Sequence, residues 1–222
     1  MPAGFASHRL RDMSSLVTVP PDSYGSDQSG LISGYLFSAD GIGRAIDSKQ
    51  AADWLRDSGA SSVGEDFVWL HFNAANTATN KWLEQNIDLS DNFFEALAER
   101  SPSTRIEYAD ETLVAILNDV IYDFSFKESS QVATLWLSID RRRLISVRRA
   151  PLRSIDRLRL AAKSGELFAS PLSLFVHLMH DQADVLLGIV RRSATQVDVI
   201  EDQLLAGRLD TTRADLGKSG FR

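Results

Sequence analysis

The stretch that decides the architecture is residues 171–207, PLSLFVHLMHDQADVLLGIVRRSATQVDVIEDQLLAG, which has no proline after its first residue and one internal glycine, Gly188. Its apolar residues follow a heptad pattern with two seam positions. The first seam position holds Val176, Ala183, Val190, Val197 and Leu204, and the second holds Leu172, Met179, Leu186, Ser193 and Ile200. The pattern predicts one helix on the order of 50 Å long, far beyond the average helix of about 11–12 residues.

A helix of this length needs neighbours, so the heptad seam predicts packing against a partner helix. A second apolar line, made of Leu174, Leu178, Val185 and Ile189, is expected to rest on the remainder of the chain. Residues 210–222 are predicted to begin a further helix, with Asp210 or Thr211 as its cap.

The segment before the long helix alternates between strand and helix signals. Residues 1–30 are rich in turn formers and are predicted to be a flexible tail, with order starting at Leu31. Residues 34–46 predict a hairpin closed on Asp40-Gly41, residues 47–57 a short helix, and residues 67–72 a central strand. Two helices should follow, the first capped by Thr77 or Thr79 and the second by Ser90, with Pro102 ending the second.

Four more strands are expected at residues 105–108, 112–124, 132–139 and 144–148. Short turns at residues 110–111 and 140–143 join the first two and the last two of them, which favours antiparallel pairing. A helix over residues 154–163 should end at Gly165. The fold class is therefore α+β, an α/β/α sandwich with a mixed, largely antiparallel sheet, followed by a long helix. We divide the chain into a tail (1–30), an α/β domain (31–169) and a helical arm (170–222).

Composition excludes several classes of function. The chain of 222 residues has no cysteine, so disulfide frameworks and thiolate metal sites are absent. A formal net charge of −6 argues against nucleic-acid binding. No signal peptide is visible, and no apolar run reaches the roughly 18–20 residues that cross a bilayer. The chain by itself is expected to be soluble.

No catalytic motif emerges, so we do not expect an enzyme. Gly41 and Gly43 match two glycines of a dinucleotide fingerprint whose third is missing, and they lie in the predicted hairpin. His71, inside an apolar strand, is read as a structural histidine rather than a catalytic one. The arginines at 141–143, 148, 149 and 153 favour a charged loop, with anion binding or pairing across an interface as alternatives.

The most informative chemistry lies in His177-Leu178-Met179-His180-Asp181-Gln182-Ala183-Asp184. On a helix, His177 pairs with Asp181 and His180 with Asp184, each at four residues' spacing. Imidazole and carboxylate together form a ligand set for zinc, although a solvated helix face with mild side-chain pairing is the plainer reading. A complete metal site would need a further ligand or water from another helix or subunit.

Residues 68–73, VWLHFN, and residues 144–148, LISVR, each resemble a segment of a known family. The first resembles the Val-Trp-Leu-His-Leu-Asn segment, and the second the Phe-Ile-Val-Ser-Thr-Arg strand, of the CorA-type divalent metal transporters, in particular of their ZntB-like zinc transporter branch. Between these two segments lie further matches at ALAE (96–99), RIE (105–107) and TLV (112–114), and VIEDQLL (199–205) follows the second, so that all the matches keep the family's order. They span roughly residues 31–209, while the family's frequent Arg-Pro-Arg is replaced by Ser103-Thr104-Arg105.

This resemblance implies the cytoplasmic funnel domain of a homopentameric transporter in the cell inner membrane, with this portion in the cytoplasm and zinc, or else magnesium, as its ion. The fragment alone is expected to be a monomer or a dimer. The family's two membrane helices and its Gly-x-Asn pore motif are not in this sequence. The roles implied are cation attraction, sensing or gating. The alternatives are a soluble α/β enzyme with a helical arm, and a regulatory or scaffold protein that oligomerises through its long helix.

Overall fold

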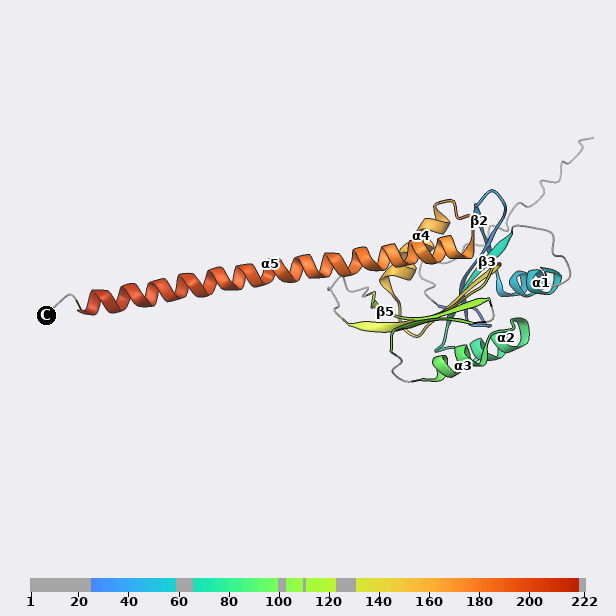
Figure 1. Cartoon of the computed structure of the whole chain (residues 1–222), viewed down its shortest axis with the longest axis horizontal. Helices are drawn as coiled ribbons and strands as arrows, with labels where there is room; N and C mark the ends of the chain where they lie inside the picture. Colours follow the sequence, from blue (N-terminus) through green and yellow to red (C-terminus); the bar gives the residue numbers. More distant parts are fainter. Residues whose placement is uncertain (1–24, 59–65, 100–102, 110, 123–130, 220–222) are drawn as a thin grey trace, which may run out of the picture.

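The computed structural model describes residues 25–58, 66–99, 103–109, 111–122 and 131–219. Seven strands and five helices lie in these ranges (Figure 1). Their bounds are β1 Leu31–Phe37, β2 Gly43–Ile46, α1 Ser48–Ser58, β3 Phe67–Asn73, α2 Ala78–Asn86, α3 Asp91–Ala98, β4 Arg105–Ala109, β5 Thr112–Val120, β6 Val132–Ile139, β7 Arg143–Arg148, α4 Arg153–Lys163 and α5 Pro171–Ser219.

All seven strands form one sheet in the order β2-β1-β3-β7-β6-β5-β4. Only β3 and β7 run parallel, and the other neighbours are antiparallel, which confirms the mixed, largely antiparallel sheet. As predicted, β3 is a central strand, and six of its seven residues are buried. A strand covered on both faces reads as a continuous apolar run, which is what FVWLHFN approaches.

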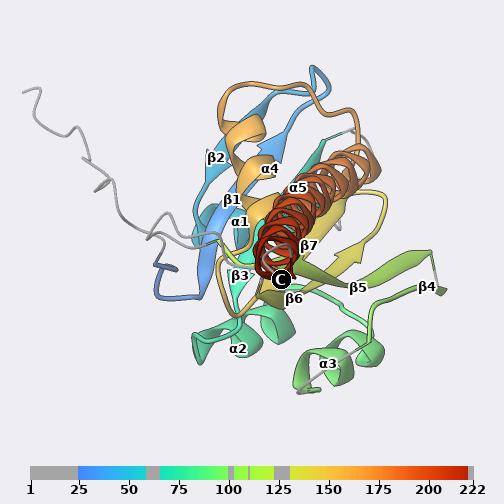
Figure 2. The same ribbon diagram turned by 90° about the vertical axis from the view of Figure 1, so that its left-hand side faces the viewer.

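Helices cover both faces of the sheet, as Figure 2 shows. Val68, Leu70 and Phe72 join the core beneath α1, α2 and α3, because alternate residues of a strand point to opposite faces. Phe67 and Trp69 point the other way, toward α4 and the first turns of α5. The predicted second apolar line is confirmed there. Leu174 and Leu178 are fully buried, Val185 is 5% exposed, and Ile189 is half-buried.

The long helix α5 is a single element of 49 residues that projects away from the α/β body (Figure 1). The prediction of a helix ending at Gly207 and a new one starting at residue 210 is therefore wrong. Glycine ends a helix when it adopts a positive φ, whereas Gly207 keeps the helical conformation. From Val190 to Ala206 the side chains are exposed, including the seam residues Val197 and Leu204. No helix in the described ranges is long and apolar enough to cross a membrane.

The first three helices differ in how their N-terminal ends are capped. Asp47 caps α1, its carboxylate accepting from the Gln50 N–H while Gln50 Oε1 accepts from the Asp47 N–H. Thr77 and Ser90 occupy the N-cap positions of α2 and α3, as predicted, although neither makes a side-chain capping hydrogen bond. Thr79 instead donates to the Asn73 carbonyl from inside α2.

The observed ends of α4, of β5 and of the predicted tail can be compared with their predicted positions. Gly165 ends α4 at φ 85°, as predicted. The strand predicted over 112–124 ends at Val120, with Ile121 forming an isolated bridge. Residues 123 and 124 and the tail residues 1–24 lie outside the described ranges. Residues 25–30, which were assigned to the tail, form a turn in which the Asp27 carboxylate accepts from the N–H groups of Ser29 and Leu31.

Candidate functional site

The predicted metal-ligand residues lie on the first turns of α5, where this helix packs against α4 and the loop between them, residues 164–170. His177 is about one-quarter exposed, and its ring stands edge-on to Phe168 at 5.4 Å between centroids. Phe168 is buried, and its N–H donates to the Gly41 carbonyl in the hairpin turn. The loop is thus attached to the body on one side and to His177 on the other.

Two carboxylates meet the His177 ring from opposite sides. Its Nδ1 lies 3.1 Å from Glu166 Oε1, and its Nε2 lies 3.4 Å from Asp181 Oδ2. Each ring nitrogen of His177 thus faces one carboxylate oxygen. The pair of His177 and Asp181 was predicted from helix spacing. Glu166 was missed, because its loop position eleven residues earlier carries no periodic signal.

Asp181 is the most perturbed acid of this group. Burial raises its pKa, and the negative charges of Asp184 and Glu166 act in the same direction, whereas His177 and Arg157 lower it. Arg157 Nη1 lies 4.0 Å from Asp181 Oδ1. Oδ2 is buried and has no hydrogen-bond partner, because its 3.4 Å contact with His177 is close but poorly directed.

The other two predicted ligands, His180 and Asp184, are exposed. Asp184 is near enough to act electrostatically on Asp181. Within the described residues, no group of three or more His, Asp or Glu side chains has the arrangement of a metal site. The structure thus brings His177, Asp181 and Glu166 into contact and leaves His180 facing solvent.

His71 belongs to a separate, buried polar network on β3 and β7. Arg148 Nε donates to His71 Nε2 at 3.0 Å, so this nitrogen must be unprotonated and the proton lies on Nδ1, 2.9 Å from Ser146 Oγ. Trp69 Nε1 donates to the same oxygen at 2.9 Å. Burial, reinforced by Arg148 and Arg159, holds the pKa of His71 well below its ordinary value of 6.5. The structural reading of His71 is confirmed.

The arginine cluster is held largely by the chain's own groups, as the charged-loop reading predicts. Arg143 pairs with Asp140 at 2.5 Å, and Arg149 donates to the Leu97 carbonyl at 3.0 Å. Arg142 donates to the Asp66 carbonyl and lies over the Trp54 ring at 5.0 Å. The contacts of Arg142 and Arg143 fix the turn between β6 and β7, and the bond of Arg149 attaches the chain after β7 to α3.

Comparison with known proteins gives consistent matches. Residues 64–220, more than half of the chain, match the family described as CorA-like Mg2+ transporter protein. The divalent cation transporter CmaX of Pseudomonas aeruginosa (strain PAO1) is 28% identical over 180 residues, covering 79% of this chain and 51% of CmaX. The chain thus spans about half the length of this curated relative.

Solved structures share the fold. Full-length CmaX superposes with a TM-score of 0.67 at 24% identity, covering 81% of this chain and 53% of CmaX. The ZntB cytoplasmic domain of Vibrio parahaemolyticus gives 0.56 at 16% identity, covering 74% of this chain and 63% of the other. The CorA soluble domain of Methanocaldococcus jannaschii gives 0.54 at 14%, covering 78% and 64%. At these identities the likeness establishes the fold alone.

Proposed function

The chain belongs to the CorA-like Mg2+ transporter family, and from this premise we propose that it is the cytoplasmic domain of a divalent cation transporter of the inner membrane. Its role is to attract the ion, to sense it or to gate its passage. Its relatives include a divalent cation transporter, and the cytoplasmic domain of ZntB has the same fold. The observation that carries the proposal is the family match over residues 64–220.

The charge of the chain suits this role. A net charge of −6 raises the local concentration of cations around the domain. Glu166, Asp181 and Asp184 concentrate part of this charge at the junction of α4 and α5. A divalent ion at this junction would relieve the repulsion among the three carboxylates, because it places positive charge between them.

We place the ion on His177 and Asp181, with Glu166, His180 and Asp184 around it. Zinc is the better candidate than magnesium, since magnesium takes oxygen ligands and water whereas zinc accepts imidazole. Two ligands do not complete a tetrahedral zinc site. Water or a group from a neighbouring subunit supplies the remaining positions, and binding between subunits would bias one arrangement of the assembly over another.

Calorimetry with zinc chloride and with magnesium chloride at neutral pH tests the site. His177→Ala should weaken zinc binding at least about tenfold, and His180→Ala should weaken it less, because His180 faces solvent. Asp202→Asn, an exposed change farther along α5, is the matched control. Unchanged zinc affinity in a His177→Ala/His180→Ala variant removes these histidines from the site without touching the family assignment.

The transport proposal needs the whole protein in lipid vesicles, where uptake of zinc and magnesium is compared under the same gradient. Uptake of neither ion would refute it.

The long helix also favours a second candidate, a soluble regulatory or scaffold protein. Along α5 the seam residues Val190, Val197 and Leu204 are 64%, 53% and 65% exposed, which suits packing against another helix. For the transporter we propose a homopentamer, with the isolated chain a monomer or dimer. Sedimentation velocity of the isolated chain separates the two proposals, because a scaffold would assemble without any membrane part, whereas the transporter domain would remain a monomer or dimer.

A further inference from the structure

The outer edge of the sheet is formed by β4, the last strand in the order β2-β1-β3-β7-β6-β5-β4. Figure 2 shows it at the rim, with β5 on its inner side. Ile106 is 53% exposed and Tyr108 is 73% exposed, and both lie on the face that carries α5, opposite Ala115 and Leu113 of β5. An edge strand turns half of its backbone N–H and C=O groups outward, where another strand can pair with them.

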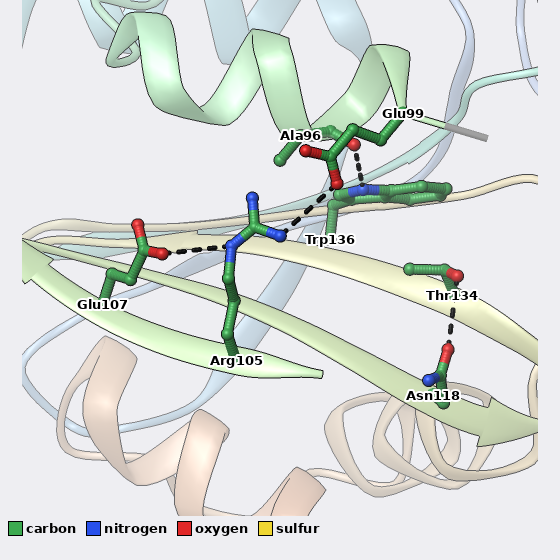
Figure 3. Close-up of polar contacts among 7 residues, drawn as sticks. All are labelled: Ala96, Glu99, Arg105, Glu107, Asn118, Thr134 and Trp136. Carbon is green, nitrogen blue, oxygen red and sulfur yellow. Dashed lines mark hydrogen bonds and ion pairs between the residues drawn. The ribbon is translucent and has the colours of Figure 1, made fainter. Parts of the chain in front are cut away.

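The opposite face of β4 carries two charges of opposite sign. Arg105 Nε lies 3.1 Å from Glu107 Oε1, and Arg105 Nη1 lies 3.4 Å from Glu99 Oε2 at the end of α3 (Figure 3). Arg105 and Glu107 are about one-third and one-half exposed, respectively. An edge strand that carries charges of one sign repels an identical strand. Here Arg105 and Glu107, two residues apart, carry opposite charges, so each can face the opposite charge on an antiparallel copy of the same strand.

We propose that β4 pairs antiparallel with β4 of a second copy of the chain. Ile106 lies opposite Ile106 on the two-fold axis, and Arg105 lies opposite Glu107 of the second copy. The charges select this register. A shift of two residues in one direction places Arg105 against Arg105, and in the other direction it places Glu107 against Glu107, both of which are unfavourable. The exposed apolar face then joins two isoleucines across the axis.

This contact is isologous, with the same patch on both copies, and it differs from the head-to-tail contact that closes a ring. It therefore goes beyond the pentamer proposed above and links two rings or two isolated domains. Only five residues per copy take part, so the pairing is weak and depends on concentration.

Cysteine cross-linking tests the register, because the chain has no cysteine of its own. In the proposed pair the two copies of residue 106 have Cα atoms about 4.5–5.5 Å apart, within disulfide range. The two copies of residue 108 are about 14 Å apart along the strands, from four residues at about 3.4 Å each. Under mild oxidation Ile106→Cys should form dimers, and Tyr108→Cys, the matched control, should not.

Charge exchange tests the pairing itself. Adding Glu107→Arg to the Ile106→Cys variant should slow cross-linking about tenfold, and further adding Arg105→Glu should restore it, because the exchanged pair is again complementary. Circular dichroism confirms that each variant is folded. Equal cross-linking at 106 and 108, no cross-linking at 106, or no restoration by the charge exchange overturns the proposal. Association through α5 alone would give the first or second of these results.

Discussion

Replacing Ser146 with alanine is expected to destabilise the fold by about 3 kcal/mol. Ser146 is fully buried, and its Oγ is the shared partner of Trp69 Nε1 and His71 Nδ1, each at 2.9 Å. Alanine removes this oxygen and leaves both donors buried without a partner. Each orphaned donor costs about 1–3 kcal/mol, and the two together fall short of their sum because the site relaxes.

The assay is urea unfolding followed by tryptophan fluorescence, to which Trp69 contributes directly. With a slope of about 2 kcal/mol per molar urea, a loss of about 3 kcal/mol lowers the midpoint by about 1.5 M. Ser138 provides a matched control, since it is a serine 4% exposed on the neighbouring strand β6. Ser138→Ala should change the midpoint little. If the two alanine variants have the same midpoint, the network does not stabilise the fold as argued.

Three further predictions concern pH and local stability. Burial lowers the pKa of His71, so the histidine of the unfolded chain takes up a proton at a higher pH than that of the folded chain. The free energy of unfolding should therefore fall as the pH drops below about 6.5, by up to about 1.4 kcal/mol per pH unit. In urea titrations at several pH values, a His71→Gln variant should lack this contribution to the pH dependence. Asp119→Ala should lower the free energy of unfolding in urea by about 2 kcal/mol, because the buried carboxylate accepts hydrogen bonds from the N–H and the hydroxyl of Ser154 at the start of α4. Unchanged amide hydrogen exchange at the start of α4 would contradict this prediction. Gly188→Ala should stabilise the fold by about 0.5–1 kcal/mol and so raise the thermal midpoint, because alanine favours the helix and the added Cβ meets only the flexible end of Arg192 at 3.4 Å. A lower thermal midpoint would refute this prediction.

One contact of the candidate cation site could be predicted from the sequence, and another could not. The contact between His177 and Asp181 follows from helix geometry, because residues four apart lie on one face of any helix. Glu166 reaches the same imidazole only because Gly165, at φ 85°, ends α4 and turns the loop back toward α5. Nothing in a single sequence indicates the direction of that turn.

The helix boundaries show the same division. The buried line of Leu174, Leu178 and Val185 was predicted because a 3.6-residue period is visible in sequence. The end of the helix was placed wrongly at Gly207, because glycine permits a break without requiring one. In the described part of α5, the backbone hydrogen bonds continued where a local signal suggested a stop.

By itself the sequence determined the kinds and order of the elements, the central place of β3, and the heptad seam of α5, because each follows from contacts between residues near one another along the chain. The sequence also indicated the pairing of strands that short turns join, whereas tertiary structure alone decided how these pairs lie beside one another in the sheet. It placed β3 parallel to β7, so that His71 met Ser146 seventy-five residues away, and it left β4 with its charges on the open edge. Such contacts depend on how whole layers pack and loops close, and these are properties of the assembled core rather than of any local pattern.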